Sequence, residues 1–167
     1  MLVDRDRIEI AVVIDASSSM SGRRREVIHY VNGVLANEHF RATRTSFTLV
    51  FFEKITMPVV ASVPITEMPE LCEDDFFPKG ECAVLDAIGE TITIFVKKLA
   101  EIPAGQPLPG RVIIITLTEG VDTASSHYTS DEIKRRIMMH SSNFGWEFRF
   151  PVRGLSEIQE KRPGQIA

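Results

Sequence analysis

An aspartate and three serines follow the first apolar run of the chain. Residues Ile8 to Ile14 are apolar except for Glu9, and Asp15-Ala16-Ser17-Ser18-Ser19 comes directly after them. An apolar, β-branched run of this length is typical of a strand that is buried on both faces, as in the middle of a parallel sheet. Open α/β sheets bind their ligands just beyond the carboxyl ends of such strands. The sequence therefore places one carboxylate and several hydroxyl groups where a sheet of this kind would bind a ligand.

The elements that must position these groups follow in the order β-α-β-β-α-β-α-β. Periodicity and capping signals predict strands at 8–14, 46–53, 56–63, 111–118 and 146–150, and helices at about 23–38, 83–101 and 129–144. Two residues join the second and third strands, so these strands must form an antiparallel hairpin, and its two prolines indicate a sheet edge. Right-handed crossovers would place helices on both faces, with the strands at 8–14 and 111–118 as central neighbours.

The bulk properties indicate one globular domain. The 167 residues are 44% hydrophobic and 25% charged, and the formal net charge of −4 gives no general basic field for nucleic acid. Two cysteines do not make a disulfide framework, and neither a signal peptide nor a membrane span is recognisable, so a cytoplasmic setting is expected. We expect the domain to occupy residues 1–152, and residues 153–167 to be a tail, either a short helix or partly disordered.

Three short motifs resemble those of von Willebrand factor A domains, and they cover about residues 8–150. Asp15-Ala16-Ser17-Ser18-Ser19 matches the D-x-S-x-S signature, and Gly80 to Ile88, GECAVLDAI, resembles the second-loop pattern GGTALYDAI of compact bacterial and intracellular members. Thr116 to Asp122, TLTEGVD, resembles the third-loop TDG pattern. The first motif alone is a weak signal, whereas three in the right order, each at a predicted strand–helix junction, are specific. The resemblance implies a Rossmann-like, doubly wound α/β fold.

The resemblance also implies a metal-ion-dependent adhesion site at the carboxyl end of the sheet. The metal is usually Mg²⁺, with Mn²⁺ or Ca²⁺ as alternatives, and a partner protein supplies a Glu or Asp to the open coordination position. The corresponding positions in this chain are Asp15, Ser17, Ser19, Cys82 and Glu119. Mg²⁺ is a hard ion that prefers about six oxygen ligands, and neutral hydroxyls would leave it more positive toward an incoming carboxylate. The implied function is a protein–protein interaction module.

Two of these positions depart from the family pattern. Cys82 stands where the loop-two Thr is expected, and a thiol is a poor ligand for a hard cation. Glu119 stands where the loop-three Asp is expected and reaches one methylene further. Either Glu119 reaches the metal and fills the partner's position, or the site holds metal weakly or not at all. In the second case the domain would be regulatory or structural, with a degenerate metal site.

An enzymatic alternative starts from Asp15 as the nucleophile of a phosphatase-like hydrolase. Such enzymes usually need a second Asp two residues on, and Ser17 stands there instead, so the general acid is missing. The sequence contains no GxSxG elbow, Walker A loop or GxGxxG. Enzymatic activity is therefore not expected.

Several other residues invite simpler interpretations. We expect Asp86 to fix a loop by accepting hydrogen bonds, Asp122 to act as a loop or cap residue, and Trp146 to pack in the core. The run Lys134-Arg135-Arg136 is expected on an exposed helix face. The run Arg23-Arg24-Arg25 is either a solvated face or a docking patch beside the serine loop.

Overall fold

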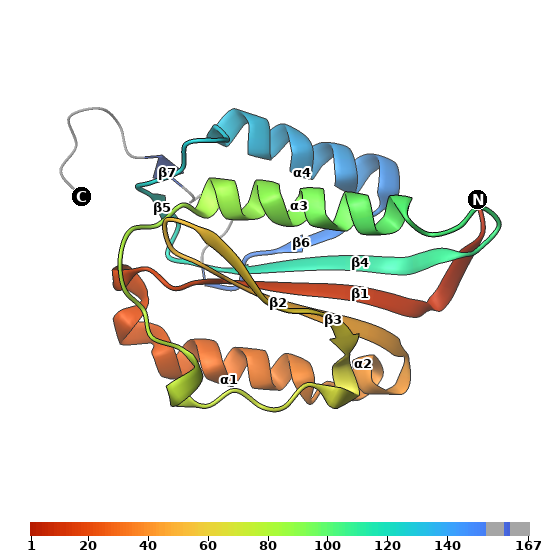
Figure 1. Ribbon diagram of the computed structural model, residues 1–167, viewed down its shortest axis with the longest axis horizontal. Coiled ribbons are helices and arrows are strands. Elements are labelled where there is room, and N and C mark those ends of the chain that lie inside the picture. Colours follow the sequence, from red (N-terminus) through yellow and green to blue (C-terminus); the bar gives the residue numbers. More distant parts are fainter. Residues whose placement is uncertain (153–158, 161–167) are drawn as a thin grey trace.

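A five-stranded sheet with helices on both faces forms the body of the molecule (Figure 1). The computed structural model describes residues 1–152 and 159–160 of the chain. The strand order is β3-β2-β1-β4-β6, and every neighbouring pair is parallel except β2 with β3. This arrangement confirms the predicted α/β fold, with β1 and β4 as central neighbours and an antiparallel strand at one edge.

The elements have the following bounds. The strands are β1 Val3–Asp15, β2 Arg44–Phe52, β3 Thr56–Pro64, β4 Leu108–Leu117, β5 Val121–Asp122, β6 Glu147–Arg149 and β7 Gln159–Glu160. The helices are α1 Arg24–Leu35, α2 Glu38–Ala42, α3 Val84–Ala100 and α4 Ser130–Phe144, with short 3₁₀ turns η1 Ser18–Arg23, η2 Ile65–Glu67 and η3 Glu73–Asp75. Among the described residues, no helix is both long enough and apolar enough to cross a membrane.

The side chains of β1 point alternately to the two faces of the sheet, and the core accordingly has two layers. Even-numbered residues such as Ile10 and Val12 face α1 and α2, whereas odd-numbered residues such as Ala11 and Val13 face α3 and α4. Figure 1 shows one helical layer on each side of the sheet. Because successive side chains of a strand point to opposite faces, a strand buried on both faces must be apolar at nearly every position. Trp146 lies in the layer under α3 and α4, as predicted.

The observed elements differ from the predicted ones at several boundaries. The helix predicted at about 23–38 is observed as α1, and its ends lie within three residues of the predicted ones. The short helix α2 was not predicted; the side chain of Asn37 accepts the Phe40 N–H and caps its start. The strand predicted at 111–118 already begins at Leu108. Gln159–Glu160 pairs in parallel with β5, which the tail prediction for 153–167 did not foresee. The rest of that prediction, at 153–158 and 161–167, lies outside the described residues.

Candidate functional site

The carboxylate of Asp15 lies at the carboxyl end of β1 and is hydrogen-bonded on both oxygens. Oδ1 accepts the backbone N–H of Ser17 at 2.8 Å. Oδ2 accepts the hydroxyl of Thr118 at 2.7 Å and the thiol of Cys82 at 3.4 Å. These donors come from three loops, which follow β1, follow β4 and precede α3. Asp15 itself is 1% exposed, so its carboxylate joins the three loops from inside rather than facing solvent.

Backbone contacts join the same loops to one another. Ser18 donates its N–H to the carbonyl of Gly80 at 3.0 Å, and Cys82 donates its N–H to the hydroxyl of Thr123 at 2.9 Å. Gly80 has a φ of +79°, and a Cβ there would lie 2.8 Å from a carboxylate oxygen of Glu53. Glycine is favoured at this position because it adopts this left-handed conformation freely, whereas another residue would be strained and would displace the Glu53 side chain.

Asp86 fixes the loop that leads into α4. Its carboxylate accepts three consecutive backbone N–H groups, at 2.9 to 3.0 Å, from Ser126, His127 and Tyr128. The prediction that Asp86 is a loop-fixing acceptor is confirmed.

Asp122 ties the start of α3 to the loop after β4. It accepts the N–H of Leu85 at 3.3 Å and the hydroxyl of Ser125 at 2.6 Å, which confirms its predicted role as a loop and cap residue. Burial raises the pKa of Asp122 above its usual value, and these hydrogen bonds oppose that shift.

The hydroxyls of Ser17 and Ser19 are 3.0 Å apart. Two neighbouring ligands of an octahedral Mg²⁺ ion, each about 2.1 Å from the metal, would also be about 3.0 Å apart. Ser17 is buried and Ser19 is exposed, so this pair reaches from the interior to the surface. The same separation is that of an ordinary hydrogen bond between the two hydroxyls, so it is compatible with a magnesium site and also with a site that holds no metal.

Cys82 does not suit a magnesium site. Its thiol is buried, and burial together with the nearby charge of Asp15 raises its pKa far above the ordinary value. Cys82 is therefore a neutral thiol that donates a hydrogen bond to Asp15. It offers no oxygen to a hard cation.

Glu119 is bound by an arginine. Its Oε1 accepts the Arg23 Nε–H at 2.5 Å, and Arg23 also donates to Glu26 at 2.8 Å. The contact with Glu119 is the largest cause of the raised pKa of Arg23. Within residues 1–152 and 159–160, no group of three or more His, Cys, Asp or Glu side chains is placed to hold a metal ion. The structure thus brings Asp15, Ser17, Ser19 and Cys82 together, and pairs Glu119 with Arg23.

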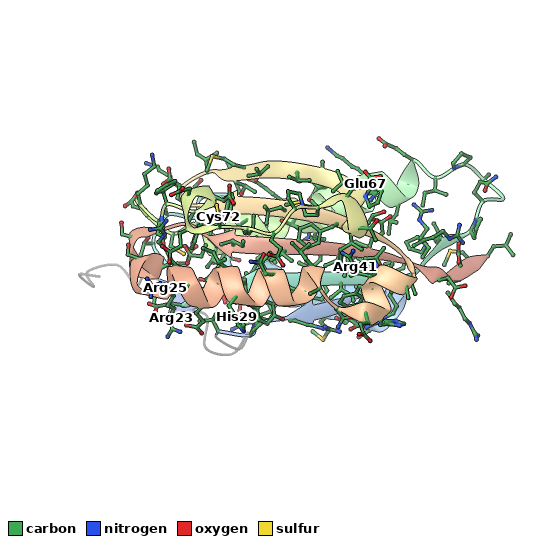
Figure 2. All side chains as sticks on the ribbon, turned by 90° about the horizontal axis from the view of Figure 1, so that it is seen from below. Arg23, Arg25, His29, Arg41, Glu67 and Cys72 are labelled. Atoms are coloured by element: carbon green, nitrogen blue, oxygen red, sulfur yellow. The ribbon has the colours of Figure 1, made fainter. Side chains whose placement is uncertain are left out.

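All three arginines of the 23–25 run contact other parts of the chain near the same edge. Arg25 pairs with the carboxylate of Glu73 at 2.8 Å, and Arg24 donates to the carbonyl of Glu73. The guanidinium of Arg24 lies 5.1 Å from the centre of the Phe77 ring. Figure 2 shows Arg23 and Arg25 at one end of α1. Arg23 and Arg24 are half-buried in the contacts between η1, α1 and the neighbouring loops, whereas Arg25 is exposed, as the solvated-face interpretation expects.

Two further side chains were missed or misjudged by sequence reasoning. Thr118 donates its hydroxyl hydrogen bond to Asp15, but the sequence analysis assigns it no role of its own. A hydroxyl residue directly after an apolar strand would have indicated a position at this edge of the sheet. Arg136 was assigned to an exposed helix face. It is half-buried and donates to the carbonyl of Gly89 at 2.9 Å and to Thr93 at 3.0 Å, so it ties α4 to α3, whereas Lys134 and Arg135 are exposed as predicted.

No protein-family model and no curated protein sequence matches the chain, whereas solved structures do. A von Willebrand factor type A protein from Catenulispora acidiphila is 16% identical with a TM-score of 0.56, over 87% of this chain and 33% of that one. The pilus adhesin SpaC from Lactobacillus rhamnosus GG is 16% identical with a TM-score of 0.54, over 73% of this chain and 16% of that one. BatB from Bacteroides thetaiotaomicron is 14% identical with a TM-score of 0.51, over 86% of this chain and 65% of that one.

These similarities concern the fold. The chain spans between 16% and 65% of the lengths of these three proteins, so their activities as whole proteins do not transfer to it. The strand order, with a single antiparallel edge strand and helices on both faces, is that of a Rossmann-like α/β sheet. The chain therefore adopts a von Willebrand factor A-like fold.

Proposed function

We propose that the protein is a protein–protein interaction module that contacts its partner at the carboxyl end of the sheet. One observation carries the proposal: three loops from distant parts of the chain are joined on the buried Asp15, which holds their outer residues at the same edge of the sheet. Ser19 and Phe77 are exposed on the loops of this edge, and Arg23 is half-buried beside them. Similarity in fold to a pilus adhesin and to a von Willebrand factor type A protein supports this function.

Hydrolase chemistry through Asp15 is disfavoured by the same geometry. A carboxylate nucleophile must reach the reacting atom, and Asp15 is 1% exposed with donors on both oxygens. Neither Ser17 nor Cys82 supplies the missing general acid, because Ser17 contacts Ser19 and the thiol of Cys82 is held by Asp15. The module is accordingly proposed to act by binding alone.

We further propose that this binding does not need a metal ion. Cys82 replaces a hydroxyl ligand of the family pattern with a thiol, and Arg23 binds one of the two carboxylate oxygens of Glu119. A metal-dependent form, in which a partner carboxylate completes the coordination, is the second candidate. The 3.0 Å separation of the Ser17 and Ser19 hydroxyls is compatible with that candidate.

An affinity capture from a lysate of the source organism tests both candidates. Phe77→Ala should abolish capture of a partner, because this exposed aromatic ring lies beside the proposed contact surface. Phe144→Ala at the end of α4 is the matched control, since Phe144 is 60% exposed and Phe77 is 63% exposed. Capture should persist in EDTA and in the Ser19→Ala variant.

Two results would contradict these proposals separately. Equal capture by wild type and Phe77→Ala, together with loss in Phe144→Ala, would move the interaction surface away from the carboxyl end of the sheet. If capture depends on Phe77 but is lost both in EDTA and in Ser19→Ala, the proposed location of the partner surface stands. The proposal that binding needs no metal ion would then be wrong, and the metal-dependent candidate would take its place.

A further inference from the structure

A hollow of about 500 Å³ lies at the end of the sheet opposite Asp15, where β1 and β2 begin. Its lining comes from β1, α2, β2, the end of β3 and η2. Three arginines, Arg7, Arg41 and Arg44, are among the lining residues, and no Asp or Glu is. A hollow with three guanidinium-bearing residues and no acid in its wall is suited to an anion.

Two of these arginines are neighbours in the sheet. Arg7 of β1 and Arg44 of β2 are register partners, so their side chains leave the sheet on the same side. Like charges at adjacent positions of a sheet are destabilising unless an opposite charge lies between or beside them. Glu9 supplies that opposite charge for Arg7, and Asp4 supplies it for Arg44. These two arginines are therefore already paired, and they offer less to an anion than an unpaired arginine would.

The acids nearby are shared among several cations. Glu9 is 1% exposed and contacts both Arg7, at 3.3 Å, and Lys98. Asp4 pairs with Arg44. Glu9 thus pairs with Arg7 and Lys98, and Asp4 pairs with Arg44. Neither of these two carboxylates pairs with Arg41.

Arg41 has no carboxylate partner in the part of the chain that the structure describes. Its hydrogen bond there goes to the carbonyl of Leu35 at 3.4 Å, close to the limit for such a contact. Arg41 is exposed, and Figure 2 shows it at the α2 end of α1, opposite Arg25. The exposed acid Glu67, next to the lining residue Thr66, is not itself part of the wall. Arg41 is therefore the guanidinium most available to a ligand.

The rest of the wall supplies hydroxyls and an apolar surface. Thr43, Ser46 and Thr66 line the hollow with hydroxyl groups, and Pro64 and Ile65 line it with carbon. The volume exceeds that of a phosphate group alone and falls within the range of small-molecule sites. An organic group attached to the anion could therefore contact Pro64 and Ile65.

We propose that this hollow binds a phosphate group, either free or as a monoester of a small molecule, with Arg41 as its principal ligand. Guanidinium donors match phosphate oxygens in pairs, and such charge-assisted hydrogen bonds are stronger than neutral ones. The site is independent of the proposed partner surface, because the two lie at opposite ends of β1. The net charge of −4 means that the protein as a whole does not attract anions.

Calorimetric titrations at low ionic strength with inorganic phosphate and with adenosine monophosphate test the proposal. Arg41→Gln should weaken binding by about tenfold or more, which is the effect of losing one charge-assisted hydrogen bond. Arg25→Gln is the matched control, since Arg25 is an exposed arginine at the other end of α1, and it should change affinity less than about twofold. Glu67→Gln should tighten binding slightly by removing a nearby negative charge.

The two ligands distinguish the sources of the phosphate. Equal affinities indicate that the free ion is the ligand, and tighter binding of the nucleotide indicates that the apolar wall is used. Amide chemical shifts of Thr43, Ser46 and Thr66 should move on addition of the ligand. Absence of binding at millimolar ligand, or equal weakening by Arg41→Gln and Arg25→Gln, would overturn the proposal.

Discussion

At the carboxyl end of β1, an acid is surrounded by neutral donors, whereas at the amino ends of β1 and β2 arginines outnumber the acids that they contact. Asp15 receives a backbone N–H, a hydroxyl and a thiol, and each donor belongs to a different loop. Arg7 shares its acid with Lys98, and Arg41 contacts only a backbone carbonyl among the described residues.

The comparison contrasts the buried carboxylate of Asp15, which has a structural role, with the exposed guanidinium of Arg41, which is available to a ligand. A buried carboxylate must find its donors within the protein, because leaving it unpaired costs several kcal/mol of stability, on the order of 3 or more. An exposed guanidinium remains hydrated without a partner, so it is left free at little cost. Asp15 and Ser17 of the first motif are therefore part of an internal junction, whereas Ser18 and Ser19 are exposed on the loop around it.

The largest expected effect comes from removing the junction acid. Asp15→Ala should lower the free energy of unfolding by about 3 kcal/mol, because three donors lose their acceptor inside the protein. Arg41→Gln at the other end should change it by less than about 0.5 kcal/mol. Urea denaturation followed by circular dichroism measures both. Similar losses in the two variants would remove the contrast between the ends.

The two cysteines provide a probe of how closed the junction is. Cys72 is exposed, whereas Cys82 is buried and its thiol pKa is raised by burial. In the folded protein at neutral pH, a thiol reagent should modify Cys72 at least about tenfold faster than Cys82. Both should react at similar rates in urea, and Cys72→Ser provides the control that isolates Cys82. Rapid modification of Cys82 in the folded protein would show that the three loops open readily.

The smallest expected effect concerns Glu147, whose carboxylate pairs with both Arg111 and Arg149. The hydrogen bond from Arg111 is the main cause of the lowered pKa of Glu147, and Arg149 contributes as well. Because the pKa is lower in the folded state, the pairing stabilises the protein above pH 4.5, the ordinary value for Glu, and this contribution is lost as the pH falls through the lowered value.

Glu147→Gln should accordingly destabilise the protein at pH 7 by no more than about 1 kcal/mol, since the pair is partly exposed. The difference from wild type should vanish toward acidic pH. Thermal unfolding measured across the acidic range checks this behaviour. A difference that persists at the lowest pH would mean that Glu147 acts through packing rather than through charge.

Sequence patterns predicted the sheet well because buried strands and amphipathic helices are local periodicities. The apolar run at 8–14, the two-residue connection at Lys54-Ile55 and the capping box at Thr129 identified β1, the edge hairpin and the start of α4. The short helix α2 was not predicted, because its five residues are too few to show a helical periodicity. The pairing of Gln159–Glu160 with β5 was also missed, since two-residue strands carry no periodicity.

Sequence by itself thus determined the order of the elements and the edge of the sheet at which Asp15, Ser17 and Ser19 lie, because strand alternation and chain direction are encoded locally. It also flagged Cys82 and Glu119 as misfits for a hard cation, from the chemistry of their side chains alone. Only the tertiary structure decided what those residues do instead, because each partner is distant in sequence. Thr118 reaches Asp15 across 103 positions, Arg23 reaches Glu119 across 96, and Cys82 reaches Asp15 across 67.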